Sequence, residues 1–215
     1  YPIQSINDFN FYCLYNLSNH IQSSHCLLIH PDGYVIRPHL WDSSWLQYDY
    51  IGAPWRDDPT AYLDPWGKNQ RVGNGGFSLR SKKLLDVPSK VTVPWEVNEG
   101  DFYKHQNAGL YNEDGNICCH NRHIFTEQGC VYAPVQVAAH FSKEVHCPEH
   151  DGIETFGFHY HFQDIRWNKL ILMSICLVTY WSTTVHQLQI SKEEVPIINL
   201  ACGLCGYIIS LLHVW

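Results

Sequence analysis

A glycine-rich turn is the first candidate for chemistry in this chain. The segment 72–81 reads VGNGGFSLRS and places three glycines around Asn74. Glycines let a backbone turn tightly and approach a ligand without interference from side chains. Asn74, Gly75 and Gly76 are therefore candidate contacts to a polar, charged small molecule. A purely structural turn has the same composition, so the neighbouring segments must decide between the two interpretations.

Two acidic residues, Glu113 and Asp114, follow the turn in the chain. A carboxylate that faces a cavity can remove the proton from an acceptor hydroxyl as a general base. Both residues also open a predicted helix, where the helix dipole favours negative charge without any catalytic role. The sequence leaves both interpretations open.

Asp32 is a candidate metal ligand. It comes directly after the apolar run 26–29 and its short turn, at the end of a predicted strand where open α/β sheets place their ligands. A carboxylate there can hold Mg²⁺ or Mn²⁺. An Asp-Gly turn that only caps a strand has the same sequence, and position alone favours neither interpretation.

Histidines supply further candidate ligands. His159 lies in the segment FGFHYH, and imidazole is an acceptable ligand of Mn²⁺. The chain has 14 histidines, so any single one is more often a surface or core residue than a ligand. The stretch 118–123 combines two cysteines with two histidines, but its spacing matches no standard zinc site.

An α/β unit over residues 1–163 must position these side chains. Hydrophobic spacing predicts helices near 6–16, 38–46, 81–86 and 113–128, the last one stopped by Gly129. Apolar or alternating runs predict strands near 26–29, 34–36, 48–52, 77–81, 131–133 and 135–137, with 77–81 half-buried. The polar segment 56–71 is predicted to be a mobile loop.

Bulk composition narrows the class of protein. The chain has 215 residues, and its contents of 45% hydrophobic and 14% aromatic residues indicate a packed globular body. Its formal net charge is −7. No basic run is present, and this disfavours nucleic acid as a partner. The nine cysteines are scattered, so the sequence leaves the secretory pathway or Golgi and the cytoplasm open as locations. The chain opens without a secretory signal and has the look of a fragment.

Residues 164–215 differ from the preceding part and form an apolar tail. The segment 195–215 has no charged residue and is long enough to span a membrane. Three interpretations compete: a membrane segment, a buried helix, and a non-homologous tail from a faulty gene model. The last is favoured over membrane insertion because flanking cations are missing.

The candidate residues lie in blocks that resemble a known family. The matching blocks are LLIHPD at 27–32, YDYIGAPW at 48–55, the turn at 72–81, NED at 112–114 with Ile117-Cys118, and FGFH at 156–159, with AHFSKE at 139–144 as a further one. In this order they resemble the family catalogued as domain of unknown function 5672. Members of that family look like glycosyltransferases of the GT-A type.

The resemblance implies a GT-A-like (Rossmann-like) fold, a mixed sheet flanked by helices. It further implies a nucleotide-sugar donor, a glycan or other hydroxyl acceptor, and a divalent cation, Mn²⁺ or Mg²⁺. Asp32 and His159 would hold the cation, and Asp114, with Glu113 as second choice, would be the base. Substrate contacts would come from the glycine turn (Asn74, Gly75 and Gly76) and from Trp55.

Two departures from the family pattern stand out. His30 occupies the position two before Asp32, so the two-aspartate form of the metal motif is absent. Only 31 residues precede Asp32, so the nucleotide-binding half that a GT-A fold places there is expected to be incomplete. The sequence therefore predicts a truncated family member whose own activity is undecided.

Three functions compete at this point. The first is a metal-dependent glycosyltransferase domain. The second is a carbohydrate- or protein-binding module that kept the fold and lost the donor site. The third is a structural zinc protein built on the cysteines and histidines. The many tryptophans and tyrosines suit sugar stacking in the first two cases.

Overall fold

The computed structural model describes residues 3–58, 63–95, 112–159, 197–202 and 207–213. The first element is helix α1 (Ile6–Tyr15), which starts where the Ser5 side chain accepts a hydrogen bond from the amide of Asp8. Such an N-cap satisfies one of the free amides at the helix start. α1 buries Phe9, Cys13 and Leu14 against the rest of the fold, as the apolar spacing predicts.

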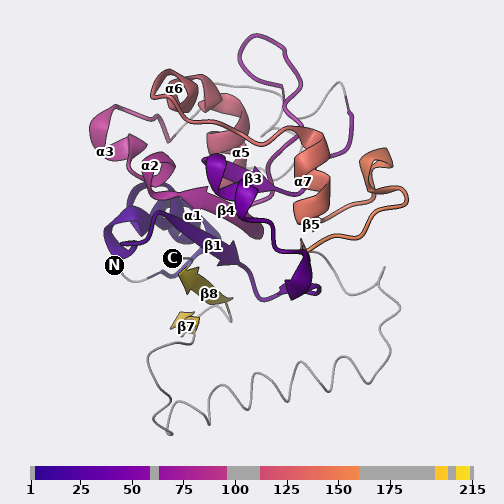
Figure 1. Ribbon diagram of the computed structural model, residues 1–215. Coiled ribbons are helices and arrows are strands. Elements are labelled where there is room, and N and C mark those ends of the chain that lie inside the picture. The colour runs from indigo at the N-terminus through magenta and orange to yellow at the C-terminus, as the bar shows by residue number, and fades with distance from the viewer. Residues whose placement is uncertain (1–2, 59–62, 96–111, 160–196, 203–206, 214–215) are drawn as a thin grey trace, which may run out of the picture. The chain divides into compact units, whose positions relative to one another are not determined.

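A five-stranded sheet forms the centre of the fold, and all its pairings are antiparallel. Its order is β3-β4-β1-β8-β7, and Figure 1 shows β3, β4 and β1 side by side. The strands are β1 (His25–Ile29), β3 (Tyr50–Gly52), β4 (Phe77–Ser81), β7 (Ile197–Cys202) and β8 (Tyr207–His213). The predicted central strand at 26–29 is therefore confirmed as β1.

The register between β1 and β4 determines what lies at one end of this sheet. His25 is opposite Ser81, and Ile29 is opposite Phe77. Because the strands run in opposite directions, the residues that follow β1 lie beside the residues that precede β4. The turn after β1 and the glycine-rich turn are thus neighbours in space.

A second, smaller sheet has three strands in the order β2-β6-β5 and mixes both directions. Its strands are β2 (Gly33–Val35), β5 (Ser142–Lys143) and β6 (Gly157–His159). Gly33 is opposite His159 in the antiparallel pair, and Ser142 is opposite Gly157 in the parallel pair. The fold is therefore α/β with one antiparallel and one mixed sheet.

Short helices and a π-helical turn lie between β4 and β5 along the chain. They are α2 (Lys82–Leu85), α3 (Val87–Lys90), α5 (Glu113–Gly115), a π-helical turn (Asn116–His120), α6 (Arg122–Glu127) and α7 (Val135–Phe141). The expected helix over 113–128 is present in three pieces, and Gly129 stops it with a φ of 77°. The predicted helix over 38–46 is instead two 3₁₀ segments, Pro38–Leu40 and Ser43–Gln47.

The prediction of extended structure over 135–137 is wrong, because α7 occupies this segment. Val135 and Val137 suggested strand alternation. Pro134 stands before the first helical residue, and Ala138 and Ala139 join Phe141 on the buried side. Helical burial of these residues outweighs the weak strand preference of two valines.

Strand β4 is also more buried than expected. All five of its residues are buried, including Arg80, whose exposed fraction is 0%. Phe77 contacts Phe141 and Phe156, with ring centroids 5.3 and 6.0 Å apart. The alternation of polar and apolar residues correctly predicted a strand with one polar and one apolar face. The prediction that the strand is half-buried is wrong, because both faces are covered by other parts of the fold.

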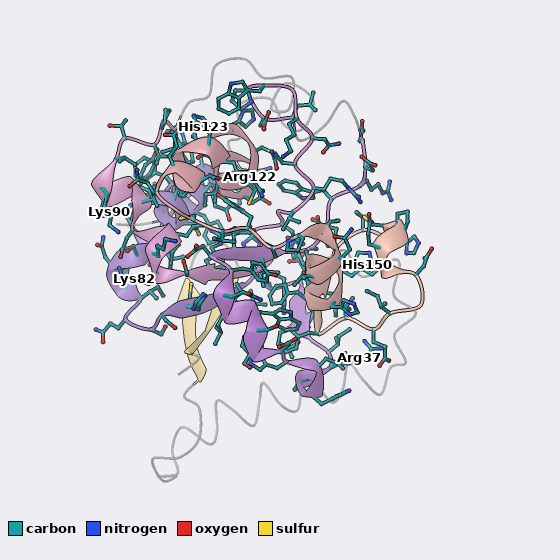
Figure 2. The ribbon with its side chains drawn as sticks, turned by 45° about the horizontal axis from the view of Figure 1, so that its top comes forward. Arg37, Lys82, Lys90, Arg122, His123 and His150 are labelled. Atoms are coloured by element: carbon teal, nitrogen blue, oxygen red, sulfur yellow. The ribbon has the colours of Figure 1, made fainter. Side chains whose placement is uncertain are left out.

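Basic side chains on the helices make ion-pair and cation–π contacts with neighbouring residues. Lys82 of α2 pairs with Asp86, and the guanidinium of Arg122 on α6 lies 3.8 Å from the ring centroid of Tyr132. Figure 2 shows Arg122 beside its neighbour His123 on α6, and Lys82 and Lys90 projecting from α2 and α3. These contacts fix the helices that follow the glycine-rich strand.

The loop after β3 is ordered around one carboxylate in the part that the structure describes. Asp64 accepts hydrogen bonds from the amides of Trp66 and Lys68 and from the side chain of Gln70. Residues 59–62 of the expected mobile loop lie outside the described residues. The described part of 56–71 has this defined hydrogen-bond pattern.

The two described segments of the apolar tail are extended. β7 and β8 pair with each other in antiparallel register, and β8 pairs with β1 at Cys26 and Leu27. Residues 164–196 of the tail lie outside the described residues. Among the helices that the structure describes, none has both the length and the apolar character needed to cross a membrane.

Candidate active site

The two sheets bring three separate parts of the chain to one place. The amide of His30 donates a hydrogen bond to the carbonyl of Gly76, 2.8 Å away, where the turn after β1 contacts the glycine-rich turn. Gly33 pairs with His159 across β2 and β6. The segments around Asp32, Gly76 and His159 are therefore neighbours, although they are far apart in sequence.

Two imidazoles and a carboxylate form a compact group there. Nε2 of His159 lies 3.1 Å from Oδ1 of Asp32. One ligand atom from each of His30, Asp32 and His159 lies within 4.8 Å of the other two. Nδ1 of His159 lies 3.5 Å from Oε1 of Glu144. Imidazole and carboxylate donors at these separations fit a first-row divalent cation.

The two imidazoles of this group differ in charge: His159 is protonated beside the carboxylate of Asp32, and His30 is neutral. Burial lowers the pKa of His159, but its hydrogen bonds to Asp32 and Glu144 outweigh burial and raise the pKa to about 9. The same hydrogen bond from His159 holds the pKa of Asp32 below its usual value. Burial lowers the pKa of His30 to about 4, so this imidazole is neutral at physiological pH.

The glycine corner, residues 73–76 of the glycine-rich turn, lets the side chains of His159 and Glu113 come close to its backbone. A Cβ atom on Gly76 would lie 2.1 Å from Nε2 of His159, and one on Gly75 would lie 2.3 Å from Oε1 of Glu113. Both positions therefore need glycine for space. The sequence predicted that the backbone of these glycines approaches a ligand. In the structure the backbone approaches the side chains of His159 and Glu113.

Asn74 shapes the corner from within. It has a φ of 65°, which is uncommon outside glycine but tolerated by asparagine. Its Oδ1 accepts a hydrogen bond from the amide of Gly76, 2.9 Å away. Asn74 is 1% exposed, and its Nδ2 donor has no hydrogen-bond partner among the residues described. A buried donor without a partner is a candidate contact for a ligand oxygen.

Asp114 lies against the same corner. Its Oδ2 accepts a hydrogen bond from the amide of Gly75 at 2.8 Å, and its Oδ1 accepts one from the amide of Gly115 at 2.7 Å. Burial and then the negative charge of Glu113 raise the pKa of Asp114 to about 7. This carboxyl can therefore both bind and release a proton near neutral pH.

Glu113 has a different environment from its neighbour. It is 3% exposed, and its Oε1 accepts a hydrogen bond from Nη2 of Arg80 at 2.6 Å. Burial raises the pKa of Glu113, but the Arg80 guanidinium outweighs burial and keeps the pKa below its usual value. Arg80 also lies 5.3 Å from the ring centroid of Tyr50. Glu113 is thus a fixed negative charge, which leaves Asp114 as the better candidate base.

Trp55 lies beneath the turn. It is 4% exposed, and its ring fills the space that a side chain on Gly73 would need. Its carbonyl accepts hydrogen bonds from Arg71. In this position Trp55 supports the backbone of the turn, and the face of its ring is covered.

Three residues of the site were not among the predicted ones. His30 and Glu144 join His159, and Arg80 joins Glu113. His30 had one usable signal, its position two residues before Asp32. Glu144 and Arg80 had none in local spacing, because their partners come from more than a dozen residues away: the pairing of β5 with β6 brings His159 to Glu144, and helix α5 brings Glu113 to Arg80. The described part of the Cys118–His123 stretch forms no comparable group of ligands.

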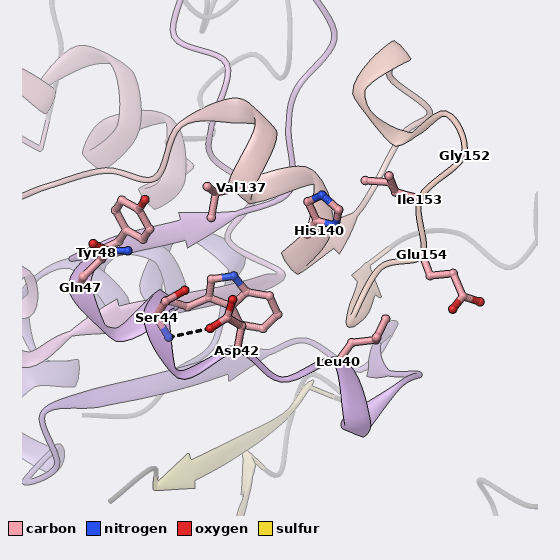
Figure 3. A pocket seen from close by; sticks show the side chains of 11 residues that line it. Leu40, Asp42, Ser44, Gln47, Tyr48, Val137, His140, Gly152, Ile153 and Glu154 are labelled. Atoms are coloured by element: carbon pink, nitrogen blue, oxygen red, sulfur yellow. Dashed lines mark hydrogen bonds between the residues drawn. The ribbon is translucent and has the colours of Figure 1, made fainter.

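A separate surface pocket has a volume of about 630 Å³ and shares no residue with this group (Figure 3). In Figure 3 the polar side chains at its wall include Asp42, whose Oδ1 accepts a hydrogen bond from the amide of Ser44 at 2.8 Å. The residues around it are Leu40, Asp42, Ser44, Trp45, Gln47, Tyr48, Val137, His140, Gly152, Ile153 and Glu154. No predicted catalytic or metal-binding residue lies at its wall.

Comparison with known proteins identifies the family and nothing finer. The family model described as "Protein of unknown function (DUF5672)" matches residues 3–159. No curated protein and no solved structure matches the chain. The matched range holds every residue of the candidate site, from His30 to His159. The chain therefore belongs to the DUF5672 family of proteins of unknown function.

Proposed function

We propose that residues 1–163 are a glycosyltransferase domain that moves a sugar from a nucleotide-sugar donor to a hydroxyl acceptor with the help of a divalent cation. The observation that carries the proposal is the meeting of three features at one place. They are the group around Asp32 and His159, the glycine corner, and the carboxyl of Asp114.

Asp114 has the properties of a general base for an acceptor hydroxyl. Its two hydrogen bonds to the amides of Gly75 and Gly115 fix its orientation. Its pKa of about 7 lets it accept a proton at physiological pH and release it afterwards. In the proposed step the acceptor oxygen passes its proton to Asp114 and bonds to the anomeric carbon. The bond from that carbon to the diphosphate breaks, and the diphosphate leaves with the electron pair.

The other residues of the site bind and orient the substrates. We propose that the buried Nδ2 donor of Asn74, which has no hydrogen-bond partner among the described residues, donates to a sugar or phosphate oxygen next to the glycine corner. The ion pair of Arg80 and Glu113 holds the start of α5, and with it Asp114, against Gly75. Asp32 and His159 would hold a divalent cation, since their ligand atoms are 3.1 Å apart. When bound, such a cation stabilises the negative charge of a departing diphosphate.

Kinetics of an Asp114→Asn variant test this proposal. The 215-residue chain would be supplied with a panel of nucleotide sugars and Mn²⁺, with water or added glycans as the sugar acceptor, and release of the nucleoside diphosphate would be followed. We expect the variant to lose turnover at least 100-fold while its donor affinity stays within a few-fold, because a base acts only as the acceptor reacts. Asp151→Asn, an exposed carboxylate paired with His146, serves as the control.

Two outcomes would contradict the proposal. Turnover in the Asp114→Asn variant at the rate of the unaltered chain would remove Asp114 from the mechanism. Binding of glycans without binding of any nucleotide sugar would favour a carbohydrate-binding module in place of a transferase.

A further inference from the structure

The residue that breaks the two-aspartate motif lies inside the candidate metal group. His30 occupies the position two before Asp32 and follows the last residue of β1. Its ring centroid lies 5.5 Å from that of His159, with the two rings at 88°. A ligand atom of His30 falls within 4.8 Å of those of Asp32 and His159. We propose that His30 is a third metal ligand, and that this site selects Mn²⁺, Co²⁺ or Zn²⁺ over Mg²⁺.

The separations of the three donors are compatible with one ion. Two ligands of an ion with bonds of about 2.1 Å are at most about 4.2 Å apart. The donor atoms of His30, Asp32 and His159 are within 4.8 Å of one another. The two most distant donor atoms therefore need to come closer by less than about 2.1 Å, the length of one metal–ligand bond. Side-chain rotation is enough for a movement of this size.

The scaffold holds the three side chains from different directions. The backbone amide of His30 is fixed on the carbonyl of Gly76. His159 is fixed by its place in β6, and its ring lies against Gly76, where only a glycine leaves room. Phe9 of α1 also packs against His30, with ring centroids 5.2 Å apart. Packing of this kind positions the three side chains before any ion binds, and His159 would release its proton when it becomes a ligand.

The donor set determines the class of cation. Two imidazole nitrogens and one carboxylate suit Mn²⁺, Co²⁺ and Zn²⁺, whereas Mg²⁺ prefers oxygen donors and retained water. Glu144, 3.5 Å from Nδ1 of His159, supplies the outer partner that orients a metal-bound imidazole. The inference rests on the proposed function for the role of the ion, but binding of the ion can be measured without any transfer.

Titration of the metal-free chain with single metals tests the inference. After removal of metals by a chelator, Co²⁺, Mn²⁺, Zn²⁺ and Mg²⁺ would each be titrated by calorimetry, and Co²⁺ also by visible absorption. We expect one Co²⁺ per chain with at least 100-fold weaker Mg²⁺ binding. We also expect no thiolate-to-cobalt band, since the six cysteines whose side chains the structure describes lie outside the group. His30→Ala and the shape-conserving His30→Gln should weaken Co²⁺ binding at least tenfold.

Two further variants make the result specific. His30→Asp should replace one nitrogen donor of the metal site by an oxygen donor, and so reduce the preference for Co²⁺ over Mg²⁺ at least tenfold. His120→Gln changes another buried histidine, and should bind Co²⁺ as the unaltered chain does. Circular dichroism of each variant would establish that it is folded.

Each outcome bears on a distinct claim. Folded His30→Gln that binds Co²⁺ as tightly as the unaltered chain would overturn the assignment of His30. Equal affinity of the unaltered chain for Mg²⁺ and Co²⁺ would overturn the proposed selectivity. If Co²⁺ binds through His30 but no nucleotide sugar reacts, the metal site stands and the transferase proposal fails.

Discussion

The raised pKa of Asp114 predicts an unusual dependence of stability on pH. The carboxyl has a usual pKa of 3.8, and in the folded chain the pKa is about 7. Between these values the folded chain holds a proton that the unfolded chain has released. The free energy of unfolding therefore falls as pH rises through this range, and the contribution is lost above pH 7.

The size of the effect follows from the shift. Each pKa unit corresponds to about 1.4 kcal/mol, so a measurement from pH 5 to pH 8 should cover about 2 to 3 kcal/mol. Asn at position 114 keeps the shape of the side chain but cannot ionise. We expect Asp114→Asn to gain about 2 to 3 kcal/mol over the unaltered chain between these two pH values.

Urea unfolding followed by tryptophan fluorescence at pH 5 and pH 8 measures this difference. Glu149→Gln is the matched control, because the hydrogen bonds from Arg71 lower the pKa of Glu149 to about 2. Glu149 is ionised in both states above pH 5, so its variant should differ from the unaltered chain by a constant amount. A constant difference for Asp114→Asn as well would refute the reasoning about the environment of Asp114.

Three other predictions follow from the same contacts. Arg80→Met should destabilise the chain by about 3 to 5 kcal/mol in urea unfolding, because it leaves the buried Glu113 without its partner; a second substitution, Glu113→Gln, should recover part of this loss, and no recovery would contradict the pairing. Gly76→Ala should weaken Co²⁺ binding at least tenfold by displacing His159, and unchanged titration curves would argue against this contact. The turnover of the proposed transfer should rise with pH to a plateau above about 7, as Asp114 ionises; turnover that falls over this range would exclude Asp114 as the base.

Local signals in the sequence predicted much of the fold. Apolar spacing over 6–16 predicted α1, the run Cys26–Ile29 predicted the central strand, and Gly129 marked the end of α6. Each of these features depends on residues within a few positions of one another. The prediction over 135–137 was wrong because Val135 carries a strand preference that is weaker than helical burial.

Long-range contacts were the part that the sequence could not supply. Alternation in β4 indicated two faces, but only the complete fold covers the face that carries Arg80. Glu144 reaches His159 because β5 and β6 pair in parallel, and no local spacing encodes that pairing. Asp32, Gly75 and Asp114 were picked by type and position, and the strand register brings them to one corner. Their chemical roles stay predictions.

The central claim is that this corner binds a nucleotide sugar through a divalent cation. Calorimetric titration of the 215-residue chain with a panel of nucleotide sugars in Mn²⁺ tests it most directly. The account predicts that at least one donor binds, and that binding is lost with a chelator and in the Asp32→Asn variant. Failure of every donor to bind the Mn²⁺-loaded chain, or binding that a chelator leaves unchanged, would contradict it.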